Sequence, residues 1–303
     1  MKRRRSLQAL AALGTLGVPA WLCRAHADPA NPPVPPAGVG GNPDGTAMRR
    51  LRFTLTLINP HQRALLQQRF WCYLPADLPP AQRLAQVQVS MPHAVETDAL
   101  GQRILALNFD QVAPLAQKVV AVTALVASQA QPAAGSLADA GAWLKPERFI
   151  EASHALIRAR AAQLQGATPL QTMRAIYDFV RQHLHYAGYV ADDLGALYAL
   201  TQRSGDCTEY ADLVVALARA CGIPARMMGG YVTALDTSVR GQDYHNWAEV
   251  FLDGDWRVVD AQKEQWLAPR ANYIAFRIYR DVAMNAVGLA HRYRMAGDLQ
   301  VNL

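Results

Sequence analysis

The sequence predicts a protein of the α+β class, in which a small β-sandwich precedes a larger domain of helices and an antiparallel sheet. Three observations support this prediction. Short apolar runs separated by turn-forming residues fill positions 49–131. Apolar residues recur at helical spacing between positions 146 and 222. Positions 225–260 then return to strand-like alternation around the hairpin signal Asp253-Gly254.

The first 27 residues have the pattern of an export signal. Basic residues at positions 2–5 precede an apolar run over 7–22, and Ala25-His26-Ala27 forms a small-x-small cleavage site. The apolar run is shorter than the roughly 20 residues that span a bilayer, so we expect no stable membrane span after cleavage. We expect a periplasmic protein, exported by the Sec or the twin-arginine route.

Charge gives no reason to expect a nucleic-acid partner. The whole chain has a formal net charge of +6, but the predicted signal contributes five basic residues and no acidic one, which leaves +1. No basic stripe with interleaved aromatic residues follows in the remaining chain.

Composition divides the rest of the chain into four further parts. Positions 28–47 are dominated by Pro and Gly, which is typical of a flexible, partly polyproline linker. Positions 48–131 form the predicted β-sandwich, which we interpret as a packing domain in preference to a ligand-binding one. A second linker covers 132–145, and the larger domain covers 146–303. The strand-like runs of the sandwich are 51–57, 70–74, 87–91, 104–109 and 119–126.

Helix signals open the larger domain. A first helix is expected over 146–165, and Thr168-Pro169 forms an N-cap and N1 pair for a second helix. A third helix is expected to begin at Cys207 and to end at Gly222, where a residue tolerant of positive φ precedes Pro224. We expect a segment over 273–279 to form a strand and 282–294 to be amphipathic or irregular.

Three separated residues make a candidate catalytic triad. Cys207 lies in the first turn of its helix, whose free N–H groups and dipole favour a thiolate. His245 begins one strand of the predicted hairpin and Asp260 ends the other, so antiparallel pairing brings their side chains together. A thiol, an imidazole that accepts its proton and a carboxylate that orients the imidazole are the groups that nucleophilic catalysis requires.

These segments resemble the transglutaminase-like superfamily, a group of cysteine enzymes related to papain. The resemblance covers roughly residues 148–270 and implies a papain-like fold with Cys207, His245 and Asp260 as the catalytic triad. Its motifs here are Gly205-x-Cys207, the run Gly222 to Arg226, His245-x-Trp247, and Trp256 followed by Asp260.

The second oxyanion donor has two candidates beside the Cys207 backbone N–H. Tyr186 occupies a position where related proteins often carry Tyr or Trp, and Gln202 lies five residues before Cys207. We favour Tyr186 as the oxyanion donor, although either residue can instead be structural. Arg226 is interpreted as the partner of a structural ion pair.

Cysteine and histidine spacing indicates no metal site and no cofactor. The three cysteines beyond the signal are Cys72, Cys207 and Cys221, an odd number for an exported chain. Cys221 lies on the apolar stripe of its helix and is expected to be a core residue.

The expected chemistry is acyl transfer or hydrolysis at amide bonds of a protein, a peptide or a cell-wall peptide, through a thioester. Resolution of the thioester by an amine makes a transglutaminase, and resolution by water makes a cysteine protease or amidase. The triad alone does not choose between them. The alternative is a non-catalytic envelope interaction module that retains this fold.

Overall fold

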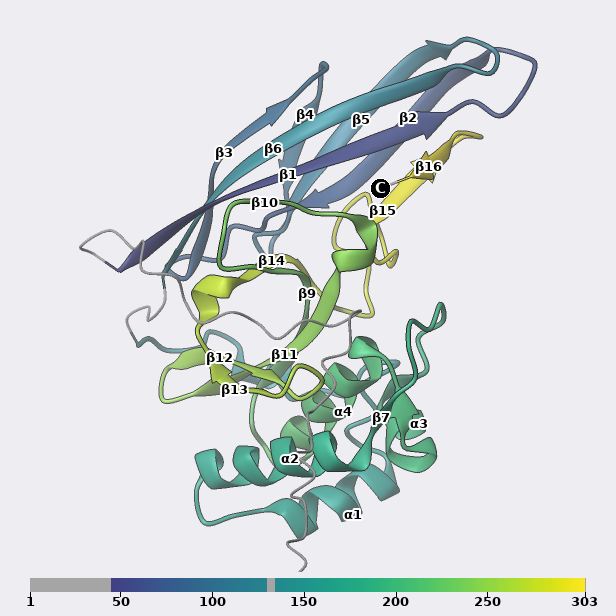
Figure 1. The fold of residues 1–303 in the computed structure, drawn as a ribbon. Helices are drawn as coiled ribbons and strands as arrows, with labels where there is room; N and C mark the ends of the chain where they lie inside the picture. The colour runs from purple at the N-terminus through teal and green to yellow at the C-terminus, as the bar shows by residue number, and fades with distance from the viewer. Residues whose placement is uncertain (1–44, 130–133, 303) are drawn as a thin grey trace, which may run out of the picture. The chain divides into compact units, whose positions relative to one another are not determined.

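The computed structural model describes residues 45–129 and 134–302 (Figure 1). The predicted signal over 1–27 and most of the predicted linker over 28–47 lie outside the described residues. Within the described part of the chain, no helix is long and apolar enough to cross a membrane.

The N-terminal part consists of two antiparallel sheets. In the first sheet β1 pairs with β6 and β6 pairs with β3, and in the second β2 pairs with β5 and β5 pairs with β4. The six strands are β1 (Thr46–Ile58), β2 (Leu65–Leu74), β3 (Gln82–Val89), β4 (Ala94–Thr97), β5 (Arg103–Val112) and β6 (Gln117–Gln129).

The two sheets share one apolar core. Burial alternates along β6, so that every second side chain is buried, as expected for a strand with one face against a core. Leu55 and Val122 of the first sheet join Phe70 and Leu107 of the second in this core. The predicted α+β class with an N-terminal β-sandwich is confirmed. Strand β4 was not predicted.

Segments from the C-terminal half return to the sandwich. Strand β10 (Thr237–Ser238) pairs with β1 in parallel, β16 (Gln300–Asn302) pairs with β1, and β15 (Tyr293–Ala296) pairs with β2. The segment that was expected to be amphipathic or irregular over 282–294 therefore ends in a strand.

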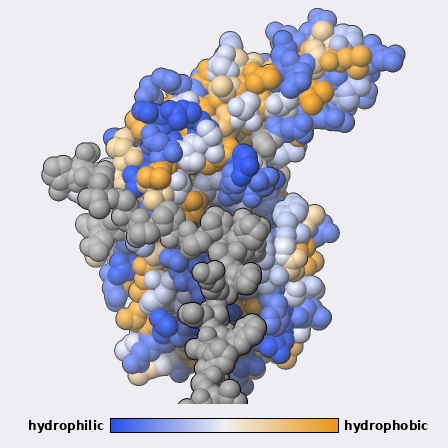
Figure 2. Space-filling view, viewed as in Figure 1, coloured by the Kyte–Doolittle hydropathy of each residue, from blue (hydrophilic) through white to orange (hydrophobic). Residues whose placement is uncertain are grey.

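The sandwich surface is mixed in polarity. On the face shown in Figure 2, hydrophobic residues lie among hydrophilic ones over the N-terminal strands. Exposed Leu66 and Val119 belong to these strands. Exposed apolar side chains scattered in this way are normal on a soluble surface and do not identify a docking site.

Four α-helices form the first part of the larger domain in the described residues. They are α1 (Ala155–Leu164), α2 (Pro169–His183), α3 (Gly195–Gln202) and α4 (Cys207–Ala220). The prediction for α2 is confirmed, because the Thr168 hydroxyl caps it by accepting the Gln171 N–H at 3.2 Å. The prediction of a helix over 146–154 was wrong, because Glu147 and Ile150 pair as an antiparallel bridge there. Helix α3 was not predicted.

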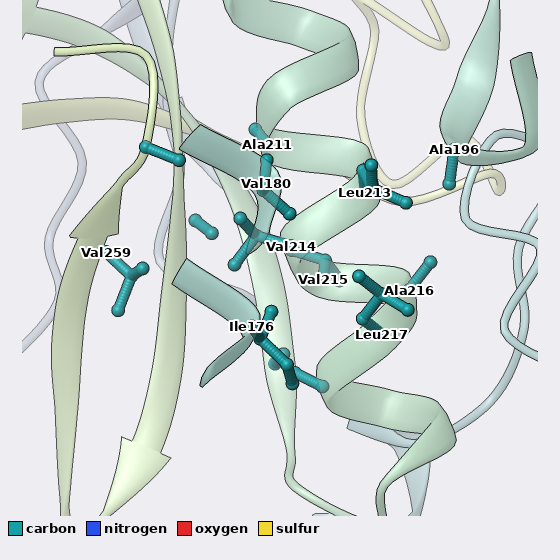
Figure 3. Close-up of a cluster of buried hydrophobic side chains, with 14 of the residues drawn as sticks. Ile176, Val180, Ala196, Ala211, Leu213, Val214, Val215, Ala216, Leu217 and Val259 are labelled. Carbon is teal, nitrogen blue, oxygen red and sulfur yellow. The ribbon is translucent and has the colours of Figure 1, made fainter. Parts of the chain in front are cut away.

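Helix α4 runs through the centre of this domain. Its Leu213, Val214 and Leu217 are fully buried among Ile176 and Val180 of α2 and the strands of the sheet (Figure 3). A helix buried on nearly all sides is held rigidly by packing. The start of α4, where Cys207 lies, is therefore a fixed position in the fold.

The sheet of this domain has the strand order β13-β12-β11-β9-β14. The predicted hairpin of β11 and β12 is confirmed, with Asp253 and Gly254 at φ 53° and 82° in its turn. The strands are β9 (Ala225–Val232), β11 (His245–Leu252), β12 (Asp255–Asp260), β13 (Gln265–Ala268) and β14 (Tyr273–Ile278).

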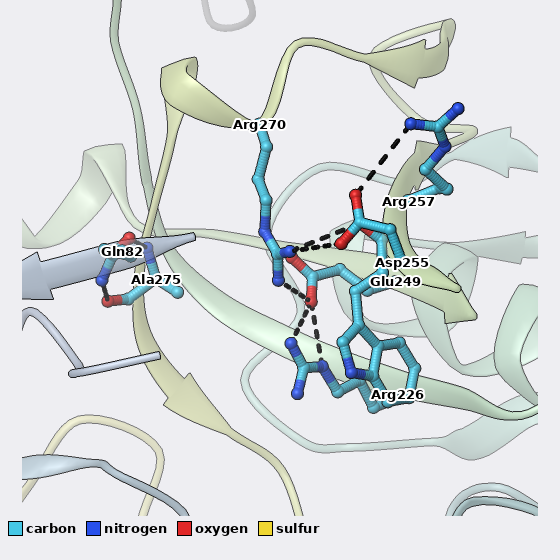
Figure 4. A network of polar contacts seen from close by, with 8 residues as sticks. Gln82, Arg226, Glu249, Asp255, Arg257, Arg270 and Ala275 are labelled. Atoms are coloured by element: carbon cyan, nitrogen blue, oxygen red, sulfur yellow. Dashed lines mark hydrogen bonds and ion pairs between the residues drawn. The ribbon is translucent and has the colours of Figure 1, made fainter. Parts of the chain in front are cut away.

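Residues of the sandwich complete the hydrogen bonds of the edge strand β14. The buried Gln82 side chain accepts the Ala275 N–H at 2.9 Å and donates to the Ala275 carbonyl at 2.8 Å (Figure 4). Gln102 accepts the Ile278 N–H at 2.8 Å. An unpaired buried backbone group is costly, so these two glutamines tie the sandwich to the sheet.

Candidate active site

The start of α4 is fixed by an acidic capping box. The Asp206 carboxylate accepts the Thr208 N–H at 2.8 Å, and the Glu209 carboxylate accepts the Asp206 N–H at 2.9 Å. Gly205 packs directly on Glu209, because a Cβ at position 205 would collide with the Cβ of Glu209. Cys207 is the first residue of α4, as predicted, and it is half-buried.

His245 and Asp260 lie on neighbouring strands. The register pairs Ala248 with Val259, so continuing it by one step sets Trp247 opposite Asp260 and puts His245 on the same face. Nε2 of His245 lies 2.7 Å from Oδ2 of Asp260. Both side chains are buried. With Nε2 engaged by the carboxylate, Nδ1 is the nitrogen left to accept a proton from a nucleophile.

Asp260 accepts three hydrogen bonds. Besides His245, the Tyr273 hydroxyl donates to Oδ2 at 3.0 Å and the Lys263 N–H donates to Oδ1 at 3.1 Å. Burial alone would raise the pKa of Asp260, but the His245 ring and the Lys263 N–H outweigh it and hold that pKa below its usual value. Asp260 is therefore an anion that can stabilise a protonated His245.

The Cys207 thiol lies near the start of β11, because the Asn246 backbone N–H and the Asp260 charge both act on its pKa. Burial, followed by the negative charge of Asp206, raises the pKa of Cys207 to about 12, although the Asn246 N–H lowers it. The expectation that the helix start favours a thiolate is therefore outweighed by desolvation. The thiol becomes nucleophilic only by giving its proton to a base.

Asn246 also joins β11 to α4. Its side-chain amide donates to the Thr208 hydroxyl at 2.9 Å, and its Oδ1 accepts from the Tyr279 hydroxyl at 3.0 Å. Thr208 follows Cys207 and Asn246 follows His245, so these bonds fix the segments that carry the two side chains. Helix and strand are held together where the candidate nucleophile and base lie.

The two oxyanion candidates occupy different surroundings. Tyr186 belongs to the short strand β7 (His185–Tyr186), pairs with Gly205 in parallel and is 43% exposed. It therefore lies alongside the residue two positions before Cys207. Gln202 ends α3, is exposed and donates to the Thr201 hydroxyl at 3.5 Å.

Cys72 and Cys221, the other two cysteines of the described residues, form no disulfide. Burial raises the pKa of Cys72 to about 12 and also raises the pKa of Cys221. Both are therefore protonated near neutral pH. Among the described residues, no group of three or more His, Cys, Asp and Glu side chains is arranged to hold a metal ion.

A buried network of ion pairs links strands β9, β11 and β12 of the sheet. Oε2 of Glu249 accepts from Arg226 Nη2 at 2.6 Å and from Arg270 Nη2 at 3.0 Å (Figure 4). Arg270 also contacts Asp255 at 3.4 Å, and the Arg226 guanidinium lies 4.1 Å from the Trp256 ring centroid. The predicted ion-pair role of Arg226 is confirmed.

Tyr273, Lys263 and Asn246 were not predicted to be neighbours of the site. Asn246 stands next to His245, and that adjacency was an available signal. Tyr273 reaches Asp260 from a strand two places removed from β11 in the sheet, so no local spacing indicates the contact.

Comparisons with known proteins agree with this architecture. Residues 158–261 match the model of the transglutaminase-like superfamily, so this part of the chain is a transglutaminase-like domain. No curated protein matches the chain.

Solved structures also match the chain. One is a candidate cysteine protease from Cytophaga hutchinsonii, with 18% identity and a TM-score of 0.57, covering 85% of this chain and 90% of that one. Another is the periplasmic domain of TgpA from Pseudomonas aeruginosa, with 16% identity and a TM-score of 0.38, covering 76% and 89% of the two chains. At 18% identity the likeness to the Cytophaga hutchinsonii structure concerns the fold alone.

Proposed function

We propose that this protein is an exported cysteine enzyme that transfers or hydrolyses acyl groups at amide bonds of a protein or peptide. Cys207 is the nucleophile, His245 the general base and acid, and Asp260 the group that orients His245. The observation that carries the proposal is the 2.7 Å contact between Nε2 of His245 and Oδ2 of Asp260, in a site where the Asn246 N–H and the Asp260 charge both act on the Cys207 thiol. Cell-wall peptides are among the proposed substrates.

The proposed reaction begins with proton transfer. His245 Nδ1 takes the Cys207 proton as the sulfur attacks the amide carbonyl, and Asp260 stabilises the resulting imidazolium. The tetrahedral intermediate collapses when His245 returns this proton to the leaving amine, which leaves a thioester on Cys207. An incoming amine or water then attacks the thioester, giving its proton to His245, and the thiol is restored when that proton returns to the sulfur.

The oxyanion of this intermediate requires hydrogen-bond donors. We assign the Cys207 backbone N–H as the first donor, because the first N–H groups of a helix have no partner within the helix. Tyr186 is the proposed second donor, supported by its pairing with Gly205. Export and a periplasmic location are also proposals, and they depend on the signal pattern at positions 1–27.

Thiol reactivity tests the proposed nucleophile. In the proposed enzyme His245 takes the thiol proton and leaves a thiolate, which overcomes the effect of burial on the Cys207 pKa. We therefore expect iodoacetamide at pH 6–7 to label Cys207 faster than the cysteine of an unfolded peptide, with the site identified by mass spectrometry. His245→Ala should slow the labelling at least tenfold, and Cys221→Ser should leave it unchanged. If Cys207 is labelled no faster than the peptide, or if His245→Ala has no effect, the enzymatic proposal fails. A non-catalytic interaction module would then be favoured.

Product analysis separates the two reaction classes. The mature protein would be incubated with envelope peptides and a biotinylated alkylamine, with Cys207→Ala as the control. Biotin incorporation would identify a transferase, and cleaved or deamidated peptides would identify a hydrolase. Products that also form with Cys207→Ala would contradict the assignment of the nucleophile.

A further inference from the structure

A cavity of about 620 Å³ adjoins the helix that carries Cys207. Thr208 and Asp212 of α4 line one part of it, and Arg277 and Tyr279, at the end of β14, line another. Pockets for small ligands measure about 300–1,000 Å³, so this cavity can hold a small molecule or the end of a peptide. None of the catalytic assignments uses it.

Arg277 lines this cavity, and none of the described carboxylates forms an ion pair with it. Its side chain is 3% exposed, and its Nη2 donates to the Leu289 carbonyl at 3.3 Å. Within the described part of the chain, Nη1 has no hydrogen-bond acceptor and no carboxylate forms an ion pair with Arg277. The guanidinium lies 4.1 Å from the Tyr279 ring centroid, which holds it in place. Burying an arginine with no counter-ion is expensive, so the cavity is suited to an anionic group.

Asp212 is a buried acidic side chain that lines the same cavity. It is 1% exposed, and Oδ2 has no donor among the described residues. Burial, followed by the charges of Glu209 and Asp193, raises the pKa of Asp212 well above its usual value. The carboxyl group therefore faces the cavity without a hydrogen-bond donor for one oxygen, and a cationic or N–H group would satisfy it.

The other charged side chains that line the cavity are either paired or exposed, and Arg148, Asp192 and Asp281 are the exposed ones. Glu147 pairs with Arg280 at 2.7 Å and with Arg219 at 3.6 Å. Asp193 pairs with His291 at 2.8 Å. Glu147 Oε1 and Arg280 Nε have no hydrogen bond but lie 2.7 Å apart as an ion pair. Among the described residues that line the cavity, Arg277 and Asp212 are therefore the buried charged groups with an unsatisfied atom and no ion-pair partner, a combination that favours a ligand carrying both signs of charge over a simple anion.

We propose that this cavity binds an unblocked amino acid or short peptide, with a free carboxylate at Arg277 and a free ammonium at Asp212. The inference rests on the proposed function and deepens it, since it names unblocked peptides as the substrate class. The cavity reaches Thr208, which follows Cys207, and Asn246 links Thr208 to Tyr279. The bound group therefore lies along the same helix as the nucleophile.

Binding to the intact Cys207→Ala protein tests the site without requiring turnover. Isothermal titration would compare alanyl-alanine with its C-terminal amide and with its N-acetyl form. We expect alanyl-alanine to bind, and each blocked form to bind at least tenfold more weakly, because each leaves one buried group unpaired. Equal affinities for the three peptides, or no binding of alanyl-alanine at millimolar concentration, would overturn the inference.

Variants assign each end of the ligand. In the Cys207→Ala background, Arg277→Gln should abolish the preference for the free carboxylate, and Asp212→Asn should reduce the preference for the free ammonium. Arg148→Gln is the matched control, because Arg148 lines the same cavity but is exposed. Equal losses in Arg277→Gln and Arg148→Gln would contradict the proposal. If Arg277→Gln does not fold, the blocked peptides still decide the question on the parent protein.

The two proposals fail separately. Slow labelling of Cys207 together with selective binding of alanyl-alanine would reject the enzyme and retain the binding site. Fast labelling with no discrimination among the three peptides would retain the nucleophile and reject the site.

Discussion

At Cys207, desolvation and hydrogen bonding act on the thiol in opposite directions. Burial and Asp206 raise its pKa, and the Asn246 N–H lowers it, with burial the larger effect. In the proposed mechanism the sulfur therefore depends on His245 for activation, and the imidazolium of His245 depends on the Asp260 charge. The proposal thus makes the reactivity of Cys207 a property of the His245–Asp260 pair.

Asp260→Asn should decrease Cys207 reactivity. The amide removes the charge that stabilises the imidazolium and offers Nε2 a neutral partner, so we expect iodoacetamide labelling at pH 7 to slow at least tenfold. Asp255→Asn is the control, because Asp255 lies on the same strand and pairs with Arg270 instead. Equal rates in the two variants would show that Asp260 has no special role.

Glu249 gives a prediction about acid stability. Burial opposes its charge, but Arg270 and Arg226 outweigh burial and hold the pKa of Glu249 below its usual value. A lowered folded-state pKa stabilises the protein above the unfolded pKa of about 4.3, and this stability is lost as the pH falls through the folded pKa. Glu249→Gln should therefore lose about 3 kcal/mol at pH 7 in urea unfolding, with a smaller loss in acid.

Asp212→Asn should change the pH dependence of stability in the opposite direction to Glu249→Gln. The raised pKa of Asp212 means that its contribution is fully present only below the unfolded pKa of about 3.9 and decreases as the pH rises. The free energy of unfolding of Asp212→Asn, measured relative to that of the parent, should be higher at pH 7 than at pH 4. The same pH trend in both variants would contradict the two pKa assignments.

At the scale of elements, helix α4 contributes both to the hydrophobic core, through its middle, and to the candidate site, through Cys207 at its start. Its central residues are fixed by packing, and its first turn is fixed by the Asp206–Glu209 capping box. The helix ends at Ala220, and Gly222, two residues beyond it, has φ 78°. The two ends of the helix therefore depend on glycine for different reasons, close contact at Gly205 and positive φ at Gly222.

Substitution of these two glycines should separate stability from reactivity. Gly222→Ala should cost about 1 kcal/mol, because an alanine at positive φ is strained, and should leave the Cys207 labelling rate unchanged. Gly205→Ala should lower both stability and labelling, because its Cβ would collide with Glu209 and displace the first turn. Thermal unfolding and labelling of both variants would check this, and similar labelling rates would contradict it.

At the scale of the whole molecule, the sandwich and the sheet of the larger domain share backbone hydrogen bonds. Gln82 and Gln102 satisfy the edge of β14, and β10, β15 and β16 return from the larger domain to the sandwich sheets. The division into 48–131 and 146–303 remains a prediction, and these shared strands suggest that the two parts unfold together.

Gln82→Leu tests this coupling. Removing the amide leaves the buried N–H of Ala275 without an acceptor, so we expect a loss of about 2 kcal/mol in urea unfolding. Gln88→Leu is the control, because Gln88 is exposed on the same strand and its change should stay within about 0.5 kcal/mol. Equal stabilities would mean that the Gln82 contacts contribute nothing.

Local patterns were sufficient for most elements. Alternation and turn residues located five of the six sandwich strands, and Thr168-Pro169 and Gly222 located helix ends. They failed over 146–154, where a bridge between Glu147 and Ile150 replaces a helix, and at α3, a short helix with no side-chain N-cap hydrogen bond. Short elements carry too few residues for their periodicity to outweigh tertiary contacts.

The sequence by itself determined the order of Cys207, His245 and Asp260 and the hairpin that brings the last two together, because strand register and helix caps are set by neighbouring residues. Tertiary structure alone decided the partners of Asp260, the desolvation of Cys207, and the cavity where Arg277 and Asp212 lie. Those properties arise from residues distant in the chain, and burial and electrostatic environment depend on how they pack together.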